Sequence, residues 1–161
     1  MFSIGDLVVH PMHGAGVIDA IVQEKINGVA QDYYVFKMPV GGLMLKIPTA
    51  NSQAIGIRTI VDAGEAEAVL QAIPDMEVAE DANWNKRYRE NMLRLKSGDL
   101  YEVARVIKAL MRRDTVRGLS TGERKMLHTA KQILISELVL SAQSEYAEIE
   151  ERLNHAMLQS S

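Results

Sequence analysis

The spacing of the apolar residues changes near residue 61, and this change constrains the fold more than any other feature of the chain. Before residue 61, short apolar runs alternate with turns rich in Gly, Pro and Asn, and Asn27-Gly28 lies between two such runs. Asn-Gly in that position is a strong hairpin signal, because both turn residues need a positive φ. After residue 61, apolar residues recur every three or four positions, as in amphipathic helices. The sequence predicts an α+β protein, with a small SH3-like or Tudor-like β-barrel followed by a C-terminal α-helical bundle.

Three segments follow from this pattern. Residues 1–61 form the β-rich domain, with strands expected at 2–10, 15–25, 31–38, 43–47 and 55–61. Residues 62–82 hold a short helix and an acidic linker that begins after Pro74. Residues 83–161 form the helical domain, in which Asn83 and Ser120 are predicted to be helix N-caps.

Charge is distributed unevenly along the chain. The 161 residues have a net charge of −3, yet residues 83–135 contain thirteen basic and five acidic side chains, a local charge of +8. A cationic segment of this kind favours a polyanionic partner, because binding responds to the local field rather than to the overall charge. The chain has no cysteine and no apolar run long enough to span a membrane. We therefore expect a cytoplasmic, nucleoid-associated monomer without a membrane partner.

The only tryptophan, Trp84, lies at the start of the predicted helix in residues 83–99. Tyr88, Met92 and Leu95 follow it at helical spacing, and five basic residues surround this apolar face. An aromatic ring among cations is typical of surfaces that bind nucleic acid. A buried tryptophan beneath a solvated basic face explains the same pattern, since tryptophan is largely buried in most proteins. The pattern by itself favours neither interpretation.

No set of residues predicts an enzyme, a metal site or a cofactor site. His10 and His13 have the spacing of half a metal site but lack a marked third ligand. Carboxylate pairs such as Glu150 and Glu151 fall on predicted exposed faces, without an apolar pocket to shift a pKa. The glycines are turn residues in a β context rather than part of a phosphate-binding loop. We therefore expect a binding protein.

Several separated motifs resemble those of the CarD and CdnL family of bacterial transcription regulators, whose N-terminal module is shared with transcription-repair coupling factor. The resemblance covers nearly all of residues 1–145. Its motifs are G-D-L-V-V-H-P-x-H-G at 5–14, L-K-I-P at 45–48, N-W-N-K-R-Y-R-E-N at 83–91, L-K-S-G-D at 95–99, L-M-R-R-D at 110–114 and R-G-L-S-T-G-E-R-K-M-L at 117–127.

The resemblance implies that the β-rich module binds the β1 or protrusion lobe of the RNA polymerase β subunit. It also implies that the helical domain contacts promoter DNA at the upstream edge of the melted bubble, without sequence-specific readout, and stabilises the open complex. Lys46 matches a basic polymerase-binding position of the family. A second basic position falls on Glu24, an acid, and the adjacent Lys25 is the alternative there.

On the DNA side, the family tryptophan corresponds to Trp84, which is expected to wedge into the minor groove. The family places contacts with the DNA backbone on a set of basic residues, which correspond here to Lys86, Arg87, Arg124 and Lys125. The basic face predicted from helical spacing adds Arg89, Arg112 and Arg113. The alternative function is a protein-interaction adaptor, whose basic helices bind RNA or only keep the protein soluble.

Overall fold

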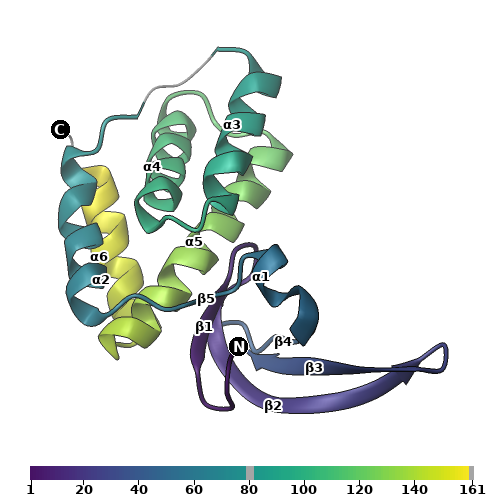
Figure 1. The fold of residues 1–161 in the computed structure, drawn as a ribbon. Helices are drawn as coiled ribbons and strands as arrows, with labels where there is room; N and C mark the ends of the chain where they lie inside the picture. Colours follow the sequence, from purple (N-terminus) through teal and green to yellow (C-terminus); the bar gives the residue numbers. More distant parts are fainter. Residues whose placement is uncertain (79–81, 160–161) are drawn as a thin grey trace.

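The computed structural model describes residues 1–78 and 82–159 and confirms the predicted α+β class (Figure 1). An antiparallel sheet formed by the first sixty residues lies at one end of the molecule, and a bundle of helices lies at the other. Part of the expected linker, residues 79–81, lies outside the described residues.

The sheet has five strands in the order β4-β3-β2-β1-β5. These strands are β1 (Leu7–His10), β2 (Gly14–Ile26), β3 (Val29–Lys37), β4 (Met44–Pro48) and β5 (Arg58–Thr59). The register of β2 against β3 shifts between Ile18 and Ala20, and such a bulge bends the sheet. The short helices η1 (Thr49–Asn51) and α1 (Ser52–Ile55) connect β4 to β5. The inward-facing residues Ile18, Tyr34, Phe36 and Ile47 form a small core of their own.

The predicted turn between β2 and β3 is confirmed by its backbone geometry. Asn27 and Gly28 have φ angles of 54° and 79°, the left-handed values that a tight hairpin turn requires. Beyond Gln23 and Asp32, β2 and β3 pair only with each other, because β4 pairs with β3 from Tyr33 onward. The end of this hairpin therefore projects from the body of the protein (Figure 1).

Four longer helices follow the expected periodicity and begin at polar N-caps or close to them. They are α3 (Trp84–Lys96), α4 (Leu100–Val116), α5 (Thr121–Ala142) and α6 (Tyr146–Leu158). The side chain of Asn83 accepts a hydrogen bond from the Lys86 backbone N–H, and that of Ser120 accepts one from the Glu123 N–H, so both predicted N-caps are confirmed. The side chain of Asp99 caps α4 in the same manner.

The segment between the two predicted domains contributes to the helical core. Helix α2 (Ala63–Ala72) buries Ala66, Val69 and Leu70 in that core, and the 3-10 turn η2 (Ile73–Asp75) adds Ile73. Helix α6 also packs in the bundle, where Ile149, Leu153 and Met157 are buried. The apolar residues that recur at helical spacing on α4 and α5 are largely core residues as well, among them Leu100, Val103, Ile107, Ile133, Leu134 and Leu138.

Helix α5 joins the bundle to the sheet. Its first turns lie at the far end of the molecule, and its later turns pack on β2, where the Ser136 hydroxyl accepts a hydrogen bond from the Ala15 N–H at 2.9 Å. Gly14 is required here, because a Cβ atom would come within 2.4 Å of the Ser136 oxygen. The buried Glu137 accepts two hydrogen bonds from Arg58 of β5, at 2.7 and 2.8 Å. The sheet and the bundle are therefore firmly docked.

Candidate nucleic-acid interface

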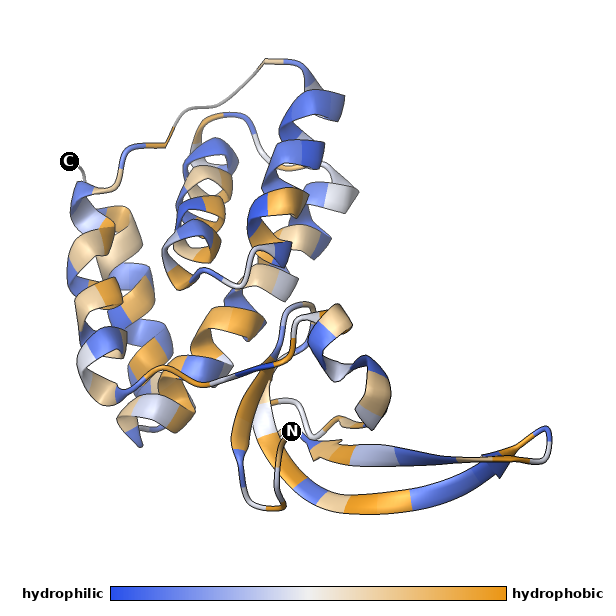
Figure 2. Cartoon of the chain, in the orientation of Figure 1, coloured by the Kyte–Doolittle hydropathy of each residue, from blue (hydrophilic) through white to orange (hydrophobic). Residues whose placement is uncertain are grey.

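Trp84 lies in the first turn of α3, at the end of the bundle farthest from the sheet (Figure 1). The residue is 42% exposed, which decides against the interpretation of a buried tryptophan. One face of the indole stacks on Tyr88, with ring centroids 5.0 Å apart and planes 18° from parallel. The first turns of α3 are otherwise hydrophilic (Figure 2). The ring is thus supported by protein on one side and open to solvent on another.

The Ser120 hydroxyl fixes the in-plane position of this ring. It accepts a hydrogen bond from the Trp84 indole Nε1–H at 3.1 Å and another from the Glu123 backbone N–H at 3.2 Å. It also donates to the Glu123 carboxylate at 3.2 Å. A hydroxyl group has one donor and two acceptor sites, so these contacts use all three. Sequence reasoning found the capping role of Ser120 but missed its bond to Trp84, which depends on a neighbouring helix.

The carboxylate of Glu123 on α5 lies beneath the tryptophan and joins this helix to α3 and α4. It is buried and accepts a hydrogen bond from the Arg87 Nε–H at 3.0 Å, while the Arg113 Nε lies 3.8 Å away. Burial acts to raise the pKa of Glu123, but the hydrogen bond and charge of Arg87, together with Ser120, hold that pKa below its ordinary value. The group therefore stays ionised near neutral pH, and its charge is compensated from α3 and α4.

The buried pair corrects part of the predicted cationic face. Arg87 was expected to contact the DNA backbone, but its side chain is 4% exposed and engaged with Glu123, so it does not offer its charge at the surface. Lys108, another cation of the basic segment 83–135, is fully buried. Its ammonium group donates to the backbone carbonyls of Ile73, Pro74 and Met76 at 2.7–3.0 Å. Arg94 and Arg105 both pair with Glu102.

Four of the predicted DNA-binding cations are exposed on α3 and α5, the two helices that the Trp84–Ser120 hydrogen bond joins. Lys86 and Arg89 lie in the first half of α3, and Arg124 and Lys125 lie in the first turns of α5. Arg112 and Arg113 lie at the end of α4 and are partly buried, so this region gathers the start of two helices and the end of a third. We use the term wedge surface for the region formed by Trp84, Lys86, Arg89, Arg124 and Lys125. It combines an exposed aromatic ring with exposed cations, a composition that suits contact with a polyanion.

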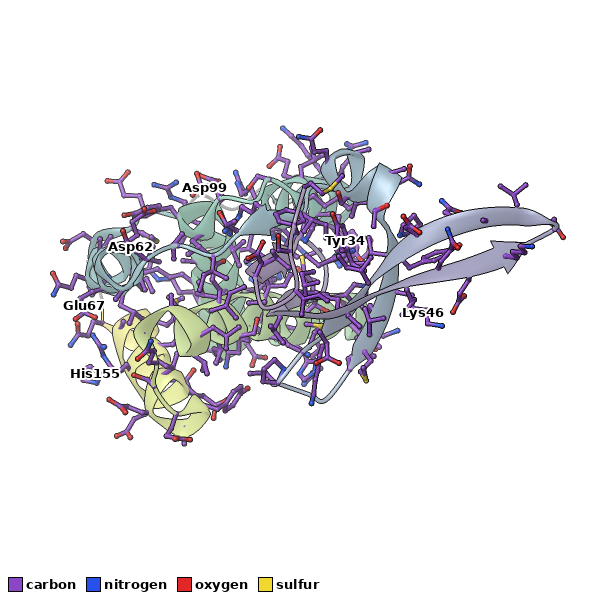
Figure 3. All side chains as sticks on the ribbon, turned by 60° about the horizontal axis from the view of Figure 1, so that its bottom comes forward. Tyr34, Lys46, Asp62, Glu67, Asp99 and His155 are labelled. Carbon is purple, nitrogen blue, oxygen red and sulfur yellow. The ribbon has the colours of Figure 1, made fainter. Side chains whose placement is uncertain are left out.

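The predicted polymerase-binding residues lie in the sheet, on the other side of the molecule. Lys46 projects from β4, which is an edge strand (Figure 3). Its ammonium group pairs with the carboxylate of Glu24 on β2. Because side chains alternate along a strand, Lys25 points to the opposite face of β2 and does not replace Glu24 beside Lys46.

The histidine pair contributes to the structure of a loop. The His10 and His13 rings lie 4.5 Å apart, and the His10 Nδ1 accepts a hydrogen bond from the Met12 N–H at 3.0 Å. Burial lowers the pKa of His10 to about 4, with a smaller contribution from His13. Within residues 1–78 and 82–159, no three His, Cys, Asp or Glu side chains gather closely enough to hold a metal ion. No helix in the same ranges is long and apolar enough to cross a membrane.

Comparison with known proteins finds matches in both parts of the chain. Residues 2–61 match the CarD-like/TRCF RID domain, a family of modules that interact with RNA polymerase, and residues 68–154 match the CarD C-terminal domain. The chain is also 36% identical over 138 residues to a protein of Bacillus subtilis (strain 168) named "Putative transcription factor YdeB", covering 86% of this chain and 90% of that relative. Since the two domain matches occur in the same order as the sheet and the helical bundle, the chain belongs to the CarD-like family of transcription factors.

Proposed function

We propose that the protein binds the β1 or protrusion lobe of the RNA polymerase β subunit through its sheet, and promoter DNA through the wedge surface. In this function the protein stabilises the open promoter complex at the upstream edge of the bubble. It reads no particular sequence, because phosphate contacts and stacking carry little information about the bases.

The observation that carries the proposal is the geometry of Trp84. The ring is 42% exposed, yet it is held by Tyr88 on one face and by the Ser120 hydroxyl at its indole nitrogen. A core residue would be covered, and an unspecialised surface aromatic would need no such support. Inserting an aromatic ring between bases costs a few kcal/mol of unstacking, and this cost is lowest where the duplex is already opening. A ring held in place in advance therefore favours melted over paired DNA, and this difference in affinity shifts the equilibrium.

The polymerase-binding part of the proposal is supported by the exposed edge of β4. An edge strand presents unpaired backbone N–H and C=O groups, to which a strand of another protein can add. Lys46 lies on this strand, and its side chain is 54% exposed. Helix α5 contacts both β2 of the sheet and α3 of the bundle, so a lobe bound at β4 and DNA bound at Trp84 would be joined through this helix.

The test is a Trp84→Ala substitution in open complexes formed with the full polymerase. We expect the complex half-life to lose most of the increase that the wild-type protein gives, while affinity for the β lobe is unchanged. Tyr101→Ala is the matched control, because Tyr101 is 39% exposed at the start of α4, away from the wedge surface. The control should retain the wild-type half-life. Equal losses in both variants would contradict a wedge function of Trp84.

A DNA-binding measurement alone distinguishes the proposed function from the alternative, a protein-interaction adaptor. The full chain is titrated with forked and with fully paired DNA at several salt concentrations. The proposed function requires tighter binding to the forked DNA and a preference that disappears in Trp84→Ala. Equal affinity for both DNAs would favour the adaptor, because phosphate contacts alone do not distinguish a fork from a duplex.

A further inference from the structure

One face of strands β2, β3 and β4 lies opposite the small core of the sheet and carries exposed apolar side chains. The pairing register defines this face, since residues directly opposite one another in a ladder point to the same side. Its members are Val17, Ala20, Val22, Glu24 and Ile26 of β2, Val29, Gln31, Tyr33, Val35 and Lys37 of β3, and Met44, Lys46 and Pro48 of β4. We call these residues the outer sheet face.

Three apolar side chains on the outer sheet face are more than half exposed. Ile26 and Val29 are 51% and 66% exposed at the hairpin tip, and Met44 is 54% exposed at the start of β4. Exposed apolar residues that continue from a free strand edge are typical of protein interfaces. The outer sheet face is continuous with the β4 edge, so one partner can cover both.

An ion pair crosses the middle of this face. Glu24 is opposite Gln31 and Lys46 is opposite Val35, so the pair joins the two strands on either side of β3. Tyr33 lies between these positions on the same face and is only 8% exposed. The two charged side chains are themselves 39% and 54% exposed. The Lys46 charge is therefore accessible to a partner but is already paired within the chain.

We infer that Glu24 competes within the chain for Lys46 and lowers the affinity of the sheet for an acidic site on the RNA polymerase β lobe. This inference rests on the proposed function and names the chemistry of the partner site: a carboxylate that meets Lys46, surrounded by an apolar surface. When the lobe binds, its carboxylate displaces that of Glu24, which must be rehydrated or paired elsewhere. Among the paired positions of the outer sheet face, the charged residues are Glu24, Lys37 and Lys46, and Asp19 is exposed in the bulge beside Ala20. Removing the Glu24 charge makes this face more positive by one charge.

The size of the effect follows from the exposure of the pair. Exposed ion pairs contribute little to stability, so displacing Glu24 costs the equivalent of a few-fold change in affinity. Such a change weakens binding to the β lobe without abolishing it. The same reasoning predicts that the effect depends on Lys46, because Glu24 acts only through this residue.

The experiment measures binding of the full chain to the isolated β lobe by calorimetry in four forms: wild type, Glu24→Gln, Lys46→Gln and the double variant. We expect Glu24→Gln to bind about two- to five-fold more tightly than wild type. Lys46→Gln should bind more weakly, and adding Glu24→Gln to it should change nothing further. Tightening by Glu24→Gln in the Lys46→Gln background would overturn the inference. So would unchanged or weaker binding by Glu24→Gln alone, the latter because it would show Glu24 contacting a cation of the lobe.

Asp32→Asn is the matched control for overall charge. Asp32 is an exposed acid on the same hairpin, but its position in β3 places it on the opposite face from Glu24 and Lys46. It should leave affinity for the lobe unchanged. If it tightens binding as much as Glu24→Gln, long-range charge explains the effect and the competition is refuted. If the wild-type protein and every variant fail to bind the lobe, the proposed polymerase contact itself is wrong.

Discussion

The indole nitrogen of Trp84 donates a hydrogen bond to the hydroxyl of Ser120 at 3.1 Å, which ties the first turn of α3 to the N-cap of α5. The two residues are 36 positions apart, and both are exposed. A ring that enters DNA benefits from being held in advance, because the cost of ordering it is then met during folding. Ser120 thus has two roles in the structure, because it caps α5 and holds the ring of Trp84.

Ser120→Ala should shorten the open-complex half-life while leaving affinity for fully paired DNA nearly unchanged. Loss of the hydroxyl frees the indole to rotate but removes no phosphate-binding charge. Loss of the N-cap should also lower the free energy of unfolding by about 1 kcal/mol. Ser120→Thr, which keeps a hydroxyl at the same position, should retain most of the half-life. Promoter-complex lifetimes and urea denaturation of the two variants measure both effects.

A second cap variant separates positioning from stability. Asp62 caps α2 by accepting a hydrogen bond from the Glu65 N–H at 2.8 Å, far from the wedge surface along the chain. Asp62→Ala should therefore lose a similar free energy of unfolding but keep the wild-type open-complex half-life. If both alanine variants shorten the half-life equally, Ser120 acts only through folding.

Lys125 should contribute a phosphate contact that is the same on every DNA sequence. Lys125→Gln should weaken DNA binding and reduce the slope of log K against log salt by about 1 in magnitude. Lys131, six residues further along α5, donates to Asn154 of α6 and lies outside the wedge surface. Lys131→Gln should leave the slope unchanged. A weaker affinity of Lys125→Gln at an unchanged slope would show that Lys125 acts through folding instead.

The elements of this fold are predictable from the sequence because their signals are local. Apolar periodicity identified the inward faces of α4 and α5, and the Asn27-Gly28 turn and the N-caps Asn83 and Ser120 are short-range patterns. The aromatic ring and its basic neighbours are also a local pattern, but that pattern is compatible with a buried or an exposed Trp84, and the structure shows the residue exposed.

The buried charges could not be predicted, because their partners come from other segments of the chain. The carbonyl groups that bind Lys108 are 32 to 35 residues away in η2 and its flanking residues. The partner of Arg87 is 36 residues away on α5. On a helical projection both residues resemble solvated cations, and only tertiary packing shows that they are internal. The predicted cationic face was therefore broader than the one that forms.

The Arg87–Glu123 pair should be a major contributor to the stability of the helical domain. Replacing one partner leaves a buried charge without its main compensation, which typically costs about 3–5 kcal/mol. We expect Arg87→Met and Glu123→Met each to lose free energy of unfolding on this scale in urea denaturation. The double variant should lose clearly less than the sum of the two, because neither charge remains. Additive losses would contradict direct coupling of the pair.

The pKa of His10 predicts how stability depends on pH. Burial lowers this pKa from 6.5 to about 4, so between these values the unfolded chain binds more protons than the folded one. The contribution of the neutral His10 ring to the free energy of unfolding is therefore fully present above pH 6.5 and is lost as the pH falls toward 4. Because the ring is only partly buried, we expect a loss of about 1–2 kcal/mol, less than the whole shift implies. In His10→Asn, whose side-chain oxygen can still accept from the Met12 N–H, this part of the pH dependence should disappear. Urea denaturation at pH 7 and pH 5 measures this change in the free energy of unfolding, and His128→Asn on α5 is the control. If the free energy of unfolding changes equally with pH in wild type and in His10→Asn, His10 does not couple protonation to folding.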